Sequence, residues 1–215
     1  MTPRDGNLVE TVKLLGNVAG QEGLDRGLNQ RTLARQIGIS VGLVNALVHR
    51  AVHKGLIKIK EAPARRYAYY LTPKGFAEKS RLVAEYLDYS LSFFRTARQE
   101  YNDVFAHCSA AGARRVILCG AGELAEIATL AANGVDVELV GVYDRETNQV
   151  RVAGLPVVRD VGDLAADAVL VITDGHQPQE LYEMLTATVG QERVQAPPFL
   201  RISPRISGSS GGARG

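Results

Sequence analysis

The sequence predicts two domains of different fold class, a small α+β domain followed by an α/β domain with a mostly parallel sheet. A chain of 215 residues is long enough for two small domains. Three observations predict this division. Positive charge gathers in the first half, the first half also shows short helices followed by paired strands, and the second half shows a strand, a glycine turn, a helix and another strand.

The formal net charge of +2 conceals an uneven distribution along the chain. Residues 1–110 contain 16 Lys or Arg and 10 Asp or Glu, whereas residues 111–215 contain 9 and 13. Between positions 26 and 81 there are 12 basic residues and only two acidic ones. Such a segment is often a solvated face, but together with the motifs below it indicates a folded domain that faces a polyanion.

Composition excludes several classes of protein. Apolar residues make up 46% and charged residues 22%, as in ordinary globular proteins. No apolar run is long enough for a membrane span, and the N-terminus lacks the apolar core of a signal peptide. Two cysteines cannot build a disulfide framework, and no Cys/His cluster has zinc-ligand spacing. We therefore expect a cytoplasmic protein without a metal and without a membrane partner.

The first half begins with three predicted helices. Residues 8–18 have helical spacing, and a loop is expected over 20–27. Asn29 is a candidate N-cap for a short helix over 30–37, which Gly38 would end in a left-handed conformation. Ser40 can then cap a helix over 41–54. Two short helices joined by a tight turn form a helix-turn-helix.

The second helix of this pair has two faces. One is apolar and can face the core: Leu43, Val44, Leu47, Val48 and Ala51. The other is the face that enters the major groove in such domains, and it carries Gly42, Asn45, Ala46, His49 and His53. Asn45 can pair with a base edge, small residues beside it permit close approach, and Arg50 and Lys54 can reach phosphates.

An antiparallel hairpin is predicted next. Residues 56–60 alternate in polarity, 61–64 form a turn, and 65–71 return as a second strand. Basic residues near its tip are placed to contact the DNA backbone or the minor groove. The predicted DNA-binding residues are Ser40, Gly42, Asn45, Ala46, His49, Arg50, Lys54, Lys58, Lys60, Arg65 and Arg66.

These runs resemble a known family. Ser-Val-Gly-Leu-Val-Asn at 40–45, Lys-Gly-Leu-Ile-Lys-Ile at 54–59 and Tyr-Tyr-Leu-Thr-Pro-Lys-Gly at 69–75 resemble MarR-type winged-helix transcriptional regulators, in particular the subgroup associated with exopolysaccharide gene clusters. The resemblance covers residues 8–105 and implies binding of double-stranded DNA. Ala46 departs from it, since many members carry a basic or polar residue there.

A long helix is predicted to begin at Pro73 or Lys74 and to continue to about His107. Its apolar and aromatic stripe comprises Leu82, Tyr86, Tyr89, Phe93 and Phe94, with Tyr101, Val104 and Phe105 further along. A stripe of this kind is usually core, but a single helix must bury it against something. We expect a homodimer through these linker helices, which would also place two recognition helices about one DNA turn apart.

The second half predicts a nucleotide-binding pattern. A buried-type strand at 116–119 leads into Gly-Ala-Gly-Glu-Leu-Ala at 120–125, then a helix to 132 and a strand over 137–142. Gly120 permits a tight turn, and Gly122 permits a phosphate to approach the helix N-terminus. Asp144 is placed to bind ribose hydroxyls and to repel a 2′-phosphate, which favours NAD-like ligands. The alternative is a parallel domain whose glycines only make a turn.

The continuation strengthens the pattern. Gly-Val-Tyr-Asp at 141–144 and Val-Ala-Gly-Leu-Pro-Val-Val at 152–158 resemble CoA-binding-like Rossmann domains of polysaccharide-biosynthesis proteins, over residues 114–202. A strand at 169–173 ends at a polar loop, Pro178 opens a helix, and 199–202 is a candidate last strand. The predicted ligand-binding residues are Gly120, Ala121, Gly122, Glu123, Leu124, Asp144, Arg145, Asp174, Gly175 and His176.

Together these observations predict a winged helix-turn-helix domain at 1–73, a linker helix at 74–110, a Rossmann-like domain at 111–206 and a disordered tail at 207–215. The expected function is a DNA-binding transcriptional regulator that senses a nucleotide-type metabolite, namely NAD(H), CoA or a nucleotide-sugar. Polysaccharide genes are the targets that the resemblance implies. The alternatives are a nucleotide-sugar enzyme, disfavoured because no nucleophile or acid–base pair stands out, and a constitutive DNA-binding protein with an architectural α/β domain.

Overall fold

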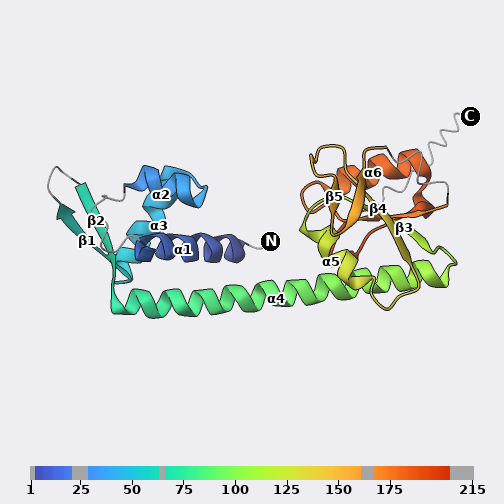
Figure 1. The fold of residues 1–215 in the computed structure, drawn as a ribbon. Helices are drawn as coiled ribbons and strands as arrows, with labels where there is room; N and C mark the ends of the chain where they lie inside the picture. Colours follow the sequence, from blue (N-terminus) through green and yellow to red (C-terminus); the bar gives the residue numbers. More distant parts are fainter. Residues whose placement is uncertain (1–2, 21–28, 63–65, 161–166, 204–215) are drawn as a thin grey trace, which may run out of the picture. The chain divides into compact units, whose positions relative to one another are not determined.

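A computed structural model of the chain describes residues 3–20, 29–62, 66–160 and 167–203. The chain divides into two compact units, Met1–Leu91 and Ser92–Gly215 (Figure 1). Most of the loop predicted at 20–27, the hairpin tip with Arg65, and the tail predicted at 207–215 lie outside the described residues.

The first unit contains three helices and a two-stranded antiparallel sheet. The elements are α1 (Pro3–Gly20), α2 (Gln30–Ile37), α3 (Val41–His53), β1 (Ile57–Ala62) and β2 (Arg66–Leu71). The predicted caps are confirmed. The Asn29 side chain accepts from the Thr32 N–H, Gly38 is left-handed at φ 80°, and the Ser40 hydroxyl accepts from the Leu43 N–H. Because these caps are local, they determine where α2 ends and α3 begins.

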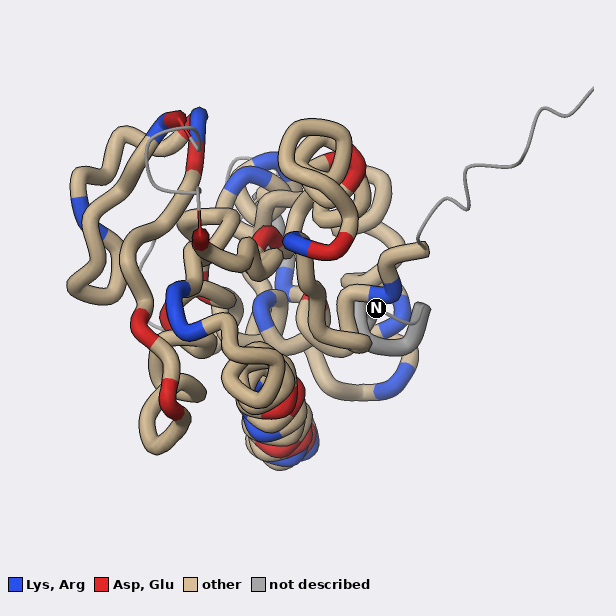
Figure 2. Tube along the Cα trace, turned by 90° about the vertical axis from the view of Figure 1, so that its right-hand side faces the viewer, with Lys and Arg blue, Asp and Glu red and all other residues tan. Residues whose placement is uncertain are grey.

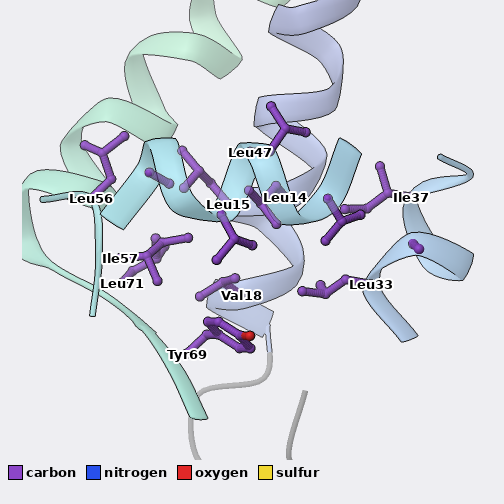
Figure 3. Packing of buried hydrophobic residues seen from close by; sticks show 14 of the residues in the cluster. Leu14, Leu15, Val18, Leu33, Ile37, Leu47, Leu56, Ile57, Tyr69 and Leu71 are labelled. Carbon is purple, nitrogen blue, oxygen red and sulfur yellow. The ribbon is translucent and has the colours of Figure 1, made fainter. Parts of the chain in front are cut away.

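A single apolar cluster holds these elements together, with side chains from α1, α2, α3 and the hairpin pointing toward one another (Figure 3). Leu14, Leu33 and Val44 are fully buried in it. One sequence expectation is wrong here, because Leu43 is 39% exposed. It lies in the first turn of α3, one position before the buried row that Val44 begins.

The long helix α4 spans Pro73–Ala110, so it begins at one of the two predicted positions and ends at the predicted boundary of the linker helix. Charged residues of both signs follow one another along it (Figure 2). The stripe predicted for dimerisation divides into three parts. Leu82 belongs to the core of the first unit, Tyr101 and Phe105 belong to a core of the second, and Tyr86 and Tyr89 are exposed.

The second unit is built on a six-stranded sheet of order β5-β6-β4-β3-β7-β8, parallel except at β5. The strands are β3 (Arg115–Cys119), β4 (Glu138–Tyr143), β5 (Arg151–Val152), β6 (Leu155–Val158), β7 (Val169–Ile172) and β8 (Val194–Gln195). The helices are α5 (Glu123–Ala131) and α6 (Pro178–Val189), with the 3-10 turns η1 (Gln191–Arg193) and η2 (Pro198–Leu200). The predicted mostly parallel sheet is confirmed.

Helices cover both faces of this sheet. Alternate residues of each strand point to opposite sides, and apolar side chains on both sides are buried under helices. Ile117 and Cys119 of β3 pack with Leu185 of α6. Val116 and Leu118 pack on the other face, with α5 and the C-terminal part of α4. The chain therefore leaves β3 over one face to reach β4, and leaves β7 over the other to reach β8.

The last strand predicted at 199–202 is wrong. Val194–Gln195 forms the edge strand instead, and Pro198–Leu200 is a 3-10 turn. Pro197 and Pro198 have no N–H to donate to a sheet. The Phe199 N–H donates to Glu100 Oε2 at 2.6 Å, and the Phe199 ring packs edge-on against Tyr101 at 5.6 Å. The segment thus binds α4 rather than extending the sheet.

Among the described residues, no helix combines the length and the apolar character that spanning a bilayer requires.

Candidate functional site

The exposed face of α3 is the first candidate site. Val44, Leu47 and Val48 are buried, so the opposite side of the helix faces solvent. All the residues predicted on this face are exposed: Gly42, Asn45, Ala46, His49 and His53. Gly42 has open space beside it, because a Cβ at this position would have no heavy atom within 4 Å. The residues of the predicted groove-facing surface are therefore all accessible to a partner in the part of the chain that the structure describes.

Asn45 has a neighbour that the sequence pattern did not indicate. The Gln30 side-chain amide, at the start of α2, donates to Asn45 Oδ1 at 3.0 Å. This bond orients the Asn45 amide and leaves its two N–H groups available to a base edge. Those groups are donors, which match the acceptors that purines present in the major groove.

The hairpin carries further basic side chains. Lys58 pairs with Tyr70 in the register, and the ammonium of Lys60 lies 5.8 Å from the centre of the Tyr70 ring. Lys58 and Lys60 are two residues apart, so they lie on the same side of the hairpin. Both are exposed, as are Ser40, Arg50 and Lys54. Arg65 and the side chain of Arg66 lie outside the described part of the chain.

The second candidate site is a pocket of about 880 Å³ outside the carboxyl ends of β3, β4 and β7. The connections from β3 and β7 cross opposite faces of the sheet, which leaves a crevice between these strand ends. All ten residues predicted to bind a ligand line it. Sequence reasoning missed eight others: Tyr143, Glu146, Thr147, Thr173, Gln177, Glu180, Leu181 and Met184. Most of these extend segments already identified, so a wider window after each strand would have found them.

Gly120 is required by the packing of the sheet rather than by a ligand. Its φ is +118°, and a Cβ there would lie 2.6 Å from the backbone nitrogen of Asp174. Gly122 differs, since it has an ordinary negative φ and open space at the same position. The two glycines of the turn therefore have different roles, with Gly120 seated against the end of β7 and Gly122 facing the pocket.

The carboxylate of Asp144 is already bonded to the chain. Oδ2 accepts from the Ala121 N–H at 2.8 Å, and Oδ1 accepts from the N–H groups of Glu146 and Thr147 at 2.8 and 2.9 Å. Burial raises the pKa of this carboxyl, but the three backbone donors outweigh it and leave the pKa below its ordinary value. Asp144 is therefore ionised at neutral pH and clamps the glycine turn to the loop after β4.

Asp174 has a similar role at the end of β7. Its Oδ1 accepts from the His176 N–H at 2.7 Å and from the Gln177 N–H at 3.3 Å, which stabilises the turn into α6. Pro178 is at the start of that helix, as predicted. His176 itself is exposed at the pocket rim.

Tyr143 places a polar group without a partner beside the pocket. The residue is 1% exposed, and among the described residues nothing is in hydrogen-bonding geometry with its hydroxyl. Burial raises the pKa of this phenol, an effect that the Arg145 guanidinium opposes. An unsatisfied buried hydroxyl is costly unless a ligand or water pairs with it.

Within the described residues, no group of three or more His, Cys, Asp or Glu is arranged to hold a metal ion.

Comparison with known proteins leaves the family open. No protein-family description and no curated protein matches the sequence. Among solved structures, MepR, a transcription regulator of the Staphylococcus aureus multidrug efflux pump MepA, is 20% identical, with a TM-score of 0.32 over 39% of this chain and 61% of that one. An O-methyltransferase from neocarzinostatin biosynthesis is 13% identical, with a TM-score of 0.28 over 91% of this chain and 63% of that one. The chain thus spans less than two thirds of either structure.

Proposed function

We propose that this protein is a DNA-binding transcriptional regulator whose second unit binds a metabolite built on a nucleoside. The observation that carries the DNA-binding part is the exposed face of α3, which follows α2 after a tight turn and precedes a basic hairpin in the chain. Helix, turn, helix and hairpin in this arrangement make a winged helix. The class of metabolite includes the nucleotides NAD(H), CoA and nucleotide-sugars.

In this proposal α3 enters the major groove and the hairpin contacts the adjacent backbone. Gly42 and Ala46 let the helix axis approach the base edges, and Asn45 supplies donors to a purine. Lys58 and Lys60 supply the sequence-independent attraction to phosphate. The surplus of basic residues between positions 26 and 81 also favours an arrangement in which this part of the chain faces the DNA.

Selection of bound duplexes from a randomised pool tests DNA recognition. The full chain should enrich a consensus, and the selected duplex should bind at least about a thousandfold more tightly than a scrambled one at the same salt concentration. Equal affinity for selected and scrambled duplexes would contradict the proposal.

The proposed regulator acts as a homodimer through α4. Four apolar side chains in the part of α4 within the first unit, Tyr86, Leu87, Tyr89 and Leu91, are between 38% and 52% exposed. A second copy of the chain is the partner that two-fold symmetry offers for such a surface. A dimer would also present two copies of α3 to half-sites about one DNA turn apart.

Sedimentation velocity at micromolar concentration tests this assembly. The wild type should sediment as a dimer, and the double variant Tyr86→Lys/Tyr89→Lys should sediment as a monomer. Val150→Lys is the matched control, because Val150 is 81% exposed and lies outside α4. A monomeric wild type, or a dimer that survives the double substitution, would refute the α4 interface.

The pocket supports the sensing part of the proposal. Its volume of about 880 Å³ is within the range of small-molecule sites, and it lies at the crevice where open parallel sheets bind ligands. We propose binding without turnover. The corresponding test incubates the protein with nucleotide-sugars and NAD(H), and product formation would favour an enzyme instead.

A further inference from the structure

The pocket is lined by groups of predominantly negative charge. Of its side chains, five are carboxylates, those of Glu123, Asp144, Glu146, Asp174 and Glu180. Among the lining side chains, all of which the structure describes, Arg145 supplies the fixed positive charge. A site built for a pyrophosphate is expected to show the reverse balance, because a buried dianion needs donors and cations around it.

Two backbone donors of the glycine turn are already used. The Gly120 N–H donates to the Tyr143 carbonyl at 2.9 Å, and the Ala121 N–H donates to Asp144 at 2.8 Å. A phosphate seated on this turn would have to displace an ionised carboxylate from Ala121 or sit beside it. The pyrophosphate of NAD(H), CoA or a nucleotide-sugar would therefore compete with the Asp144 carboxylate at the first two residues of this turn.

The helix N-termini that face the pocket also have acidic residues of the chain beside them. Glu123 is in the first turn of α5, and Glu180 is in the first turn of α6. Asp174 accepts from two N–H groups at the entry to α6. The partial positive charge that would attract an anion to each helix end is thus complemented by the chain's own carboxylates.

One feature remains available to a neutral or cationic ligand. Asp144 uses three of the roughly four acceptor positions of a carboxylate, so Oδ2 can still accept one hydroxyl. One sugar hydroxyl would occupy this acceptor position.

We propose that the pocket takes a phosphate-free nucleoside whose 5′ substituent is uncharged or positively charged. This inference rests on the proposed function, because it narrows the class of metabolite that the second unit binds. The carboxylates at the pocket wall attract a cationic 5′ group and repel a phosphate at the same position.

Calorimetric titration of the full chain with a charge series tests the inference. The probes are 5′-amino-5′-deoxyadenosine, adenosine and AMP, which share base and ribose and differ in charge at the 5′ position; the corresponding guanosine series is run in parallel. In the series that binds, the amine should bind at least as tightly as the nucleoside, and the monophosphate at least about tenfold more weakly than the amine. NAD⁺ should bind more weakly than adenosine.

The outcomes separate the two proposals. If the monophosphate or NAD⁺ binds more tightly than the nucleoside, the charge inference is wrong and nucleotide sensing stands. If no nucleoside and no nucleotide binds, the proposed ligand class fails, and the inference fails with it.

Substitutions identify the charges responsible. Glu123→Gln/Glu146→Gln should reduce the preference for the amine over AMP by about tenfold, because two carboxylates of the lining are neutralised. Glu126→Gln is the matched control, since Glu126 lies exposed on the same helix but does not line the pocket. Arg145→Gln should strengthen binding of the amine, because it removes the fixed positive charge of the lining. If the wild type instead prefers AMP and Arg145→Gln selectively loses AMP binding, Arg145 binds the phosphate and the charge inference is wrong.

Discussion

The two glycines of the turn after β3 have opposite tolerances for a side chain. Gly120→Ala should destabilise the protein by about 2–4 kcal/mol, because a Cβ would contact the backbone of Asp174 at 2.6 Å and φ is +118°. Gly122→Ala should change stability by less than about 1 kcal/mol, because the position is open and φ is −99°. Urea unfolding of both variants measures this, and similar losses would show that the turn is not seated as described.

Asp144 links two loops through three backbone N–H groups, so its ionisation should contribute to stability. Its folded-state pKa is lowered from the ordinary value of 3.8. A group of this kind contributes stability above its unfolded pKa, and the contribution is lost as pH falls through the folded pKa. Asp144→Asn should destabilise the wild-type fold by roughly 1–3 kcal/mol at pH 7. The difference between the two proteins should shrink below pH 4, and a difference that stays constant would exclude the carboxylate as its source.

Asn45 should determine sequence discrimination rather than overall affinity. Asn45→Ala removes donors to a base edge, so the preference for the selected duplex should fall by about 1–3 kcal/mol, with little change on random DNA. Gln30→Ala is an informative companion, because it frees the Asn45 carbonyl and should alter which base is preferred. Equal losses of affinity for selected and random DNA would mean that Asn45 contacts the DNA backbone rather than a base.

Local signals explain which residue roles could be predicted. Asn29, Gly38 and Ser40 act on N–H or C=O groups a few positions away, so their spacing identifies them. The role of Asp144 could not be derived in this way. Its partner Ala121 is 23 positions earlier in the chain, and only the pairing of β3 with β4 brings the two together.

At the scale of elements, the hairpin should supply salt-dependent attraction to DNA. Lys58→Ala/Lys60→Ala removes two exposed charges from one side of the sheet. If both contact phosphates, the slope of log K against log salt should become shallower by about 1.8. Lys79→Ala/Arg81→Ala is a matched control on α4, since it removes the same charge. A similar flattening in the control would mean that the effect reflects net charge rather than hairpin contacts.

The elements that sequence reasoning placed wrongly are those whose partners are distant in the chain. The segment 199–202 is short and apolar enough for a strand, but the contacts of Phe199 with Glu100 and Tyr101 decide its conformation. Gln179 also exchanges two side-chain hydrogen bonds with the backbone of Ser203, at 3.0 and 2.9 Å. The strands β3, β4 and β7 were predictable because a buried parallel strand has a continuous apolar run.

At the scale of the whole molecule, sensing requires that ligand and DNA change each other's affinity. A ligand can shift DNA binding only by binding two states of the regulator unequally. Within the second unit, a contact route leads from the pocket toward α4. Gln177 and Glu180 line the pocket at the start of α6, Gln179 holds Ser203, and the neighbouring Phe199 packs on α4.

Reciprocity gives the sharpest test of this coupling. If a nucleoside changes the Kd for the selected duplex by some factor, typically about 5–150, the duplex must change the nucleoside Kd by the same factor. Gln179→Ala should reduce this factor while leaving nucleoside affinity in the absence of DNA nearly unchanged, because its side chain contacts Ser203 and Glu183 rather than the pocket. Gly122→Val should abolish nucleoside binding and leave DNA affinity at its ligand-free value. If the wild type shows nucleoside binding with a factor of one in both directions, the second unit is architectural with respect to DNA binding, and the regulator acts constitutively.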